Sequence, residues 1–208
     1  MIEFLMAPRP DLLGFFMAGV ILLASVTLHE FAHALVATSF GDPTARLAGR
    51  LTLNPRPHLD VFGSFAILLL GFGWGKPVPV SRPKLGRGRA GPLAVALAGP
   101  TANVLLALIS ATAMAIFRPE TFGTGGRFLT MAFYLNLLYA LFNLLPIPPL
   151  DGFPILAEIL PAARRGALEF IERWAFLLLL VVGFFLFRPF VEPVVSRLGI
   201  VILRVLSL

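Results

Sequence analysis

The stretch LLGFFMAGVILLASVTLHEFAHALVATSF, residues 12–40, is an apolar run that contains His29, Glu30 and His33. A helix that crosses a bilayer needs about 20 mostly apolar residues, and this run is longer. An ionisable side chain inside such a run costs roughly 2.5–3.5 kcal/mol on insertion scales, so it indicates a function. The stretch therefore predicts a membrane helix that carries chemistry.

The composition agrees with a membrane protein. Of the 208 residues, 58% are hydrophobic and 13% are charged, whereas about a quarter of residues are charged in soluble domains. The net charge is +6, and excess Arg and Lys in a membrane protein gathers in cytoplasmic loops, so we expect a lipid bilayer and no nucleic acid as partner. The chain has no cysteine, which leaves His, Asp and Glu as metal ligands.

Further apolar runs predict an all-α polytopic membrane protein with about five or six transmembrane helices. After residues 12–39, the expected helices are 93–117, 128–146, 168–187 and 190–207. We expect a single membrane-embedded domain over residues 1–208, with a core at about 12–160 and C-terminal helices at 168–208.

The segment 41–92, between the first two core helices, has a different pattern. Its Gly and Pro residues and its alternation predict turns and a short β-like, membrane-associated region with strand-like pieces at 46–57 and 76–81. Residues 61–74 are apolar but short, which fits a short span, a re-entrant piece or an interfacial segment.

Basic residues set the expected orientation. Segment 41–92 contains eight Arg and Lys residues, whereas the next loop contains only Arg118 and Arg127. By the positive-inside rule, the first helix runs from outside to inside, and we expect a multi-pass protein whose active site lies towards the cytoplasmic side.

The pattern His29-Glu30-Phe31-Ala32-His33 is the strongest chemical signal. Residues four apart share one face of a helix, so both imidazoles can reach one zinc ion. Glu30 can then take a proton from the water that attacks a peptide carbonyl. The alternative is that these side chains only hydrogen-bond to a neighbouring helix near the membrane interface.

A catalytic zinc usually has three protein ligands and an open position. Asp151 follows a proline-rich stretch, 143–150, whose backbone cannot continue a helix; its alternative role is to cap a helix that starts near Gly152. His58 is the other candidate, as a ligand, a substrate contact or a surface residue. The residues alone leave this choice open.

Three motifs in this order together resemble the site-2 protease family of intramembrane zinc metalloproteases, in its minimal form without PDZ or CBS domains. They are His29 to His33, Gly99-Pro100-Thr101-Ala102-Asn103, and Asn143 to Gly152. Two loop stretches, Leu53-Asn54-Pro55 and Gly73 to Val80, look like further family signatures. Where the family often has Asp-Gly-Gly, this chain has Asp151-Gly152-Phe153.

The resemblance implies one zinc ion per chain and a role for each residue of the site. His29, His33 and Asp151 would bind the metal, Glu30 would activate water, Asn103 would lie near the developing oxyanion, His58 would lie near the site, and Asn143 would stabilise the unwound segment. Asn103 also fits a packing role between helices.

The expected function is hydrolysis of peptide bonds within or near transmembrane segments of another membrane protein. A zinc transporter is one alternative, although only one metal-site cluster is apparent in the sequence. A homologue that binds membrane proteins without cutting them is the other, although all four proposed chemical residues are intact. The oligomeric state is left open.

Overall fold

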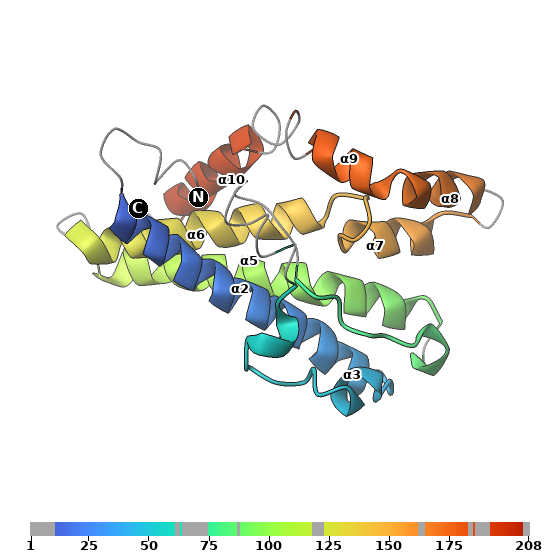
Figure 1. Ribbon diagram of the computed structural model, residues 1–208. Coiled ribbons are helices and arrows are strands. Elements are labelled where there is room, and N and C mark those ends of the chain that lie inside the picture. Colours follow the sequence, from blue (N-terminus) through green and yellow to red (C-terminus); the bar gives the residue numbers. More distant parts are fainter. Residues whose placement is uncertain are drawn as a thin grey trace.

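The computed structural model describes residues 11–60, 63, 75–86, 88–117, 123–161, 165–182, 185 and 192–205. In this part of the chain every regular element is a helix (Figure 1). The long helices are α2 (Leu12–Ser39), α5 (Ala90–Phe117) and α6 (Gly123–Asn143). The shorter ones are α3 (Thr44–Leu47), η1 (Arg56–His58), η2 (Arg82–Lys84), α7 (Gly152–Ile159), α8 (Arg165–Arg173), α9 (Ala175–Val181) and α10 (Glu192–Val205).

Two of the described helices, α2 and α5, are long and apolar enough to cross a membrane. Each has 28 residues, which gives a length of about 42 Å at 1.5 Å per residue. The expected helix at 12–39 is confirmed, and the expected helix at 93–117 lies inside α5. The total of five or six spans stays a prediction, as does the single domain.

Helices α2, α5 and α6 pack against one another and form the centre of the molecule (Figure 1). Ala107 and Ala111 lie one turn apart on α5, and together with Phe133 of α6 they belong to a buried cluster that also includes Val195 of α10. Small residues at such a helix interface allow the backbones to approach closely, and Phe133 is fully buried there.

The expected β-like region in 41–92 is wrong for the residues that the structure describes. Segment 46–57 contains the end of α3 and the start of η1, and segment 76–81 is extended without strand pairing. Pro77 and Pro79 have no N–H to donate to a ladder. Residues 61–74 lie outside the described part, except for Gly63, so whether they span the membrane stays open.

The helices after α5 differ in their limits from the expected ones. Helix α6 ends at Asn143 rather than at 146, because the prolines that follow cannot continue it. The helix expected at 168–187 is divided at Trp174 into the amphipathic α8 and the apolar α9. Helix α10 falls inside the expected 190–207.

Candidate metal centre

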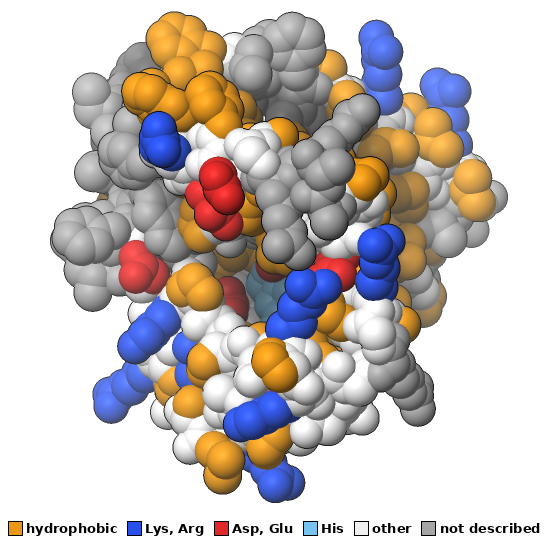
Figure 2. Space-filling model, turned by 90° about the vertical axis from the view of Figure 1, so that its right-hand side faces the viewer, with side chains coloured by type: hydrophobic (Ala, Val, Ile, Leu, Met, Phe, Trp, Pro, Cys, Tyr) orange, Lys and Arg blue, Asp and Glu red, His pale blue; other side chains and the backbone are white. Residues whose placement is uncertain are grey.

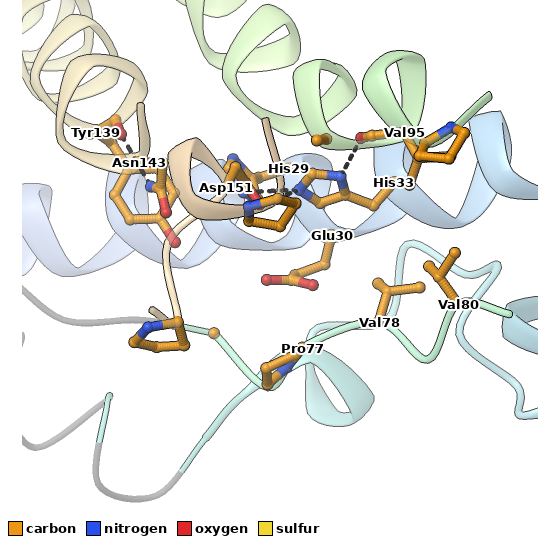
Figure 3. A pocket seen from close by; sticks show the side chains of 15 residues that line it. His29, Glu30, His33, Pro77, Val78, Val80, Val95, Tyr139, Asn143 and Asp151 are labelled. Carbon is orange, nitrogen blue, oxygen red and sulfur yellow. Dashed lines mark hydrogen bonds and ion pairs between the residues drawn. The ribbon is translucent and has the colours of Figure 1, made fainter. Parts of the chain in front are cut away.

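His29 and His33 lie one turn apart on α2, and their Nε2 atoms point at the same carboxylate (Figure 3). His29 Nε2 lies 3.0 Å from Asp151 Oδ2, and His33 Nε2 lies 3.2 Å from Asp151 Oδ1. The two Nε2 atoms are 3.1 Å apart. The structure thus brings together the three residues that the sequence analysis nominated as ligands.

The loop between α6 and α7 places Asp151 beside α2. Ile147 and Leu150 anchor this loop, because both are buried in a cluster with Leu179 of α9. A side chain at Gly152 would collide with the backbone carbonyls of Leu144 and Leu145, so a glycine after Asp151 lets the loop fold back onto itself.

The alternative role of Asp151 as a helix cap is not what the structure shows. Asp151 occupies the N-cap position of α7, but its side chain makes no capping hydrogen bond. Its Oδ2 atom is buried and makes no hydrogen bond within the described part of the chain, although it lies close to His29. The carboxylate is directed to the histidines instead.

The outer nitrogens of both imidazoles are held by acceptors. His33 Nδ1 lies 2.6 Å from the carbonyl oxygen of Val95, and a carbonyl can only accept, so this Nδ1 carries the proton. His29 Nδ1 lies 2.6 Å from Asn103 Oδ1. With both protons on Nδ1, both Nε2 atoms present lone pairs towards Asp151, as metal-binding histidines commonly do.

This arrangement fits a zinc ion. Two imidazole lone pairs and a carboxylate oxygen converge with no proton to share among them, and such a set is stabilised by a cation. A tetrahedral ion about 2.0–2.2 Å from its ligands holds them roughly 3.4 Å apart, close to the 3.0–3.2 Å found here. His29, His33 and Asp151 would hold the metal.

A cavity of about 240 Å³ lies against the three residues and is lined by Glu30. The Glu30 carboxylate points into it, between α2 and the extended segment at 77–80 (Figure 3). A side chain at Gly75 would come within 2.6 Å of Glu30 Oε1, so this glycine leaves room for the carboxylate. Figure 2 shows a hollow at this end of the molecule with a histidine at its floor.

Arg50 is a residue of the site that the sequence analysis missed. It is 5% exposed, and its Nη2 lies 3.7 Å from Glu30 Oε2. Its guanidinium also donates to the carbonyls of Lys76 and Pro77, the latter at 2.9 Å. Burial lowers the pKa of Arg50 and the Glu30 carboxylate opposes that shift. In the sequence Arg50 is one of eight basic residues in its segment, with no signal that singles it out.

The remaining nominated residues surround this centre without joining the ligand cluster. His58 is fully buried; its Nε2 donates to the carbonyl of Thr52 at 2.8 Å, and its own carbonyl accepts from the N–H of Lys76. Burial lowers the pKa of His58, which favours the neutral ring. Asn143 lines the cavity and donates to the carbonyl of Tyr139 at 2.9 Å.

Asn103 lies behind His29, on the side of the ring away from Asp151. Its amide group donates to Asn136 Oδ1 at 3.0 Å and to the carbonyl of Ser25 at 3.4 Å. These two contacts occupy the N–H groups of the Asn103 amide, so in this arrangement the amide does not donate to an oxyanion. The oxyanion role stays a prediction, and the observed contacts favour a role in holding His29.

Comparisons with known proteins agree with this site. The family model "Peptidase family M50" matches residues 121–186. The chain is 42% identical over 169 residues to "Putative zinc metalloprotease YwhC" of Bacillus subtilis strain 168, which covers 78% of this chain and 77% of the relative. It is also 37% identical over 168 residues to "Putative zinc metalloprotease Rip2" of Mycobacterium tuberculosis strain H37Rv. This second match covers 76% of this chain and 63% of the relative.

No solved protein structure matches the chain at a significant level. The match to the Bacillus subtilis relative nevertheless extends over more than three quarters of both chains. It agrees with the resemblance noted in the sequence and with the pair of membrane-length helices α2 and α5. The chain therefore belongs to peptidase family M50, the site-2 protease family of membrane zinc metalloproteases.

Proposed function

We propose that the chain is an intramembrane zinc endopeptidase that hydrolyses peptide bonds within or near transmembrane segments of other membrane proteins. The observation that carries this proposal is the convergence of His29, His33 and Asp151 beside the Glu30 carboxylate, inside a cavity. Both histidines and Glu30 belong to α2, a helix of membrane-spanning length. A hydrolytic site built into such a helix can reach bonds that soluble proteases cannot.

When bound, a zinc ion supplies Lewis acidity, which polarises a peptide carbonyl and makes water easier to deprotonate. Glu30 takes one proton from the attacking water as the new C–O bond forms. It returns that proton to the amide nitrogen as the C–N bond breaks, so the products are one carboxyl and one amino terminus. Arg50 keeps the Glu30 carboxylate near the cavity wall.

The cavity favours a substrate in extended form. A helical substrate hides its peptide carbonyls in hydrogen bonds to amides four residues on, so it must unwind locally before cleavage. Pro77, Val78 and Val80 line the cavity from an extended segment. An unwound substrate would lie in the cavity beside the side chains of this segment.

The position of the site supports a cytoplasmic orientation. His33 lies six residues before Ser39, the last residue of α2, which places it about 9 Å from that end at 1.5 Å per residue. Lys and Arg side chains gather at the same end of the molecule (Figure 2). By the positive-inside rule this end faces the cytoplasm, in a multi-pass protein embedded in the bilayer.

The test is cleavage of single-span reporter proteins reconstituted with the zinc-loaded chain in liposomes, with products identified by mass spectrometry. The native chain should cut within or beside the reporter's membrane segment, and Glu30→Gln should abolish cutting while it retains one zinc per chain. Cutting that persists in Glu30→Gln would contradict the proposal. Zinc uptake into sealed vesicles without any cutting would favour the transporter instead.

A further inference from the structure

A line of buried polar side chains leads from the metal centre across three helices. It runs from His29 on α2 through Asn103 on α5 to Asn136 on α6, and these residues are 2%, 0% and 3% exposed. Uncompensated amide groups are costly in a helix bundle. A buried pair of asparagines behind one of the metal-facing histidines therefore calls for an explanation.

The orientation of Asn136 is set by its own helix. Its Nδ2 donates to the carbonyl of Ala132 at 2.9 Å. A backbone carbonyl can only accept, so the amide nitrogen of Asn136 must be on that side. The Oδ1 atom of Asn136 consequently faces Asn103 as an acceptor.

The orientation of Asn103 follows from that of Asn136. Because Asn136 presents an acceptor, Asn103 must turn its Nδ2 towards it, and the contact is 3.0 Å. The carbonyl of Ser25, 3.4 Å away, accepts from the same nitrogen. Asn103 Oδ1 then faces His29 Nδ1 at 2.6 Å, which requires the proton of His29 to be on Nδ1.

We propose that Asn136 is a positioning residue that, through Asn103, keeps the Nε2 atom of His29 free to bind the metal. An apolar side chain at 136 would leave the Asn103 amide with the longer 3.4 Å contact to the Ser25 carbonyl, which is a weaker restraint against turning over and presenting its N–H groups to His29 Nδ1. The ring proton would then move to Nε2, where it blocks coordination. This inference rests on the proposed zinc site and adds no catalytic group to it.

The second histidine provides an internal comparison. His33 Nδ1 donates to the backbone carbonyl of Val95. That acceptor is part of the backbone of α5 and, unlike a side-chain amide, cannot turn over to present a donor. The tautomer of His33 therefore does not depend on a second side chain. A change at Asn136 should therefore affect His29 and leave the tautomer of His33 as it is.

The chain suits a direct test because it contains only three histidines. Protein labelled with ¹⁵N-histidine is observed by NMR in its metal-free form over a pH series, in the native chain and in Asn136→Leu, which keeps the number and branching of the side-chain heavy atoms. We expect the neutral ring of His29 to carry its proton on Nδ1 in the native chain and to populate the Nε2–H form in Asn136→Leu. His33 should keep its proton on Nδ1 in both.

Zinc affinity, measured by competition with a chelator, is the second readout. Loss of a residue that orients a metal ligand typically weakens metal binding about 10- to 100-fold, which is the loss expected for Asn136→Leu. Ser110→Ala is the control, because it removes another polar side chain that is buried in the bundle but whose hydrogen bond, among the described residues, is to Leu106 of its own helix. Its affinity should equal that of the native chain.

A second substitution at Asn103 distinguishes an effect of Asn136 that passes through Asn103 from a general packing defect. In Asn103→Asp, a carboxylate oxygen faces His29 Nδ1 whichever way the side chain turns. The residue at 136 therefore no longer decides whether His29 Nδ1 meets an acceptor or a donor. We expect Asn136→Leu to cause no further loss of zinc affinity in the Asn103→Asp background, as a double-mutant cycle would record. Losses of zinc affinity that add in the double variant would overturn the proposal that Asn136 acts through Asn103.

Two other results would also overturn the inference. One is a native His29 that carries its proton on Nε2 in the metal-free protein, which needs no variant to observe. The other is an Asn136→Leu chain with native ring protons and native zinc affinity. If the native chain bound no zinc, the proposed function would fail, while the ring protons would still decide the role of Asn136.

Discussion

The guanidinium of Arg50 lies 3.7 Å from the carboxylate of Glu30 and at the same time donates to the carbonyl of Pro77. One buried cation thus connects the proposed general base with the extended wall of the cavity. A buried charge is costly unless it is paired and hydrogen-bonded, and the two Nη atoms of Arg50 supply the contacts with Glu30, Lys76 and Pro77. Arg50 therefore holds Glu30 and the wall in a defined relation.

Arg50→Gln should slow cleavage of a reporter protein about 100-fold, the effect expected when a reacting group is displaced by about 1 Å. Zinc content should stay at the native level, because Arg50 contacts none of the three ligands in the structure. Arg50→Lys should recover only part of the rate, because a single ammonium cannot reproduce the planar fork. Cleavage rate and zinc per chain are the measurements.

The control is Arg46→Gln, which removes an exposed arginine from the same segment. It should leave both the rate and the zinc content unchanged. Arg50→Gln with a native cleavage rate would show that the contact with Glu30 has no part in catalysis.

Asp151→Ala should lose its zinc to a mild chelator that leaves the native chain loaded. Asp151 supplies both oxygens that face the histidines, and two imidazoles alone make an incomplete site. His58→Ala should retain zinc, because the ring of His58 bonds to Thr52 and not to the cluster. A site that depends on His58 and ignores Asp151 would contradict the ligand set.

The part of this site that lies on a single helix could be predicted from the sequence. His29, Glu30 and His33 were predictable because helical periodicity alone puts them on one face. Asp151 lies far along the chain, and the residues left it in competition with His58 until the family resemblance favoured it. Arg50 and Asn136 escaped prediction because each acquires its role from partners on other elements, Glu30 and Asn103 respectively.

The fold was predictable where apolar length decides it and less so where neighbours do. Residues 12–39 could be predicted because a long apolar run has few alternatives to a helix. The alternation in Val78-Pro79-Val80 suggested a strand, but a strand needs a paired neighbour. In the structure Arg50 binds the carbonyls of Lys76 and Pro77 instead.

Gly99→Ala should abolish zinc binding without unfolding the chain. A Cβ atom at this position of α5 would meet the Nε2 atoms of both His29 and His33, which are the atoms that face the metal. Gly19→Ala is the matched control, because a Cβ at Gly19 on α2 meets nothing within 4 Å. Zinc per chain and helix content by circular dichroism check both variants, and a zinc-loaded Gly99→Ala chain would show that the histidines can move aside.

Asp42 follows α2 and accepts a hydrogen bond from the N–H of Ser81, the neighbour of the cavity-lining Val80. This connection should depend on pH. The carboxylate is fully buried and accepts from the hydroxyl and N–H of Thr44 and from the N–H of Ser81. Burial raises its pKa, but these hydrogen bonds outweigh burial and hold the pKa of Asp42 below its usual range. The charged form is therefore favoured in the folded chain.

A lowered carboxyl pKa stabilises the fold above the pKa of the unfolded chain, about 3.9, and this stabilisation is lost as the pH falls through the lower folded value. Asp42→Asn lacks the charge and turns an amide donor towards one of the N–H groups, so it should be about 1–3 kcal/mol less stable at neutral pH. Thermal unfolding midpoints of both chains between pH 3 and pH 8 should differ most at neutral pH and converge at the acid end. A difference that stays constant over that range would mean that the pKa of Asp42 is the same in the folded and the unfolded chain.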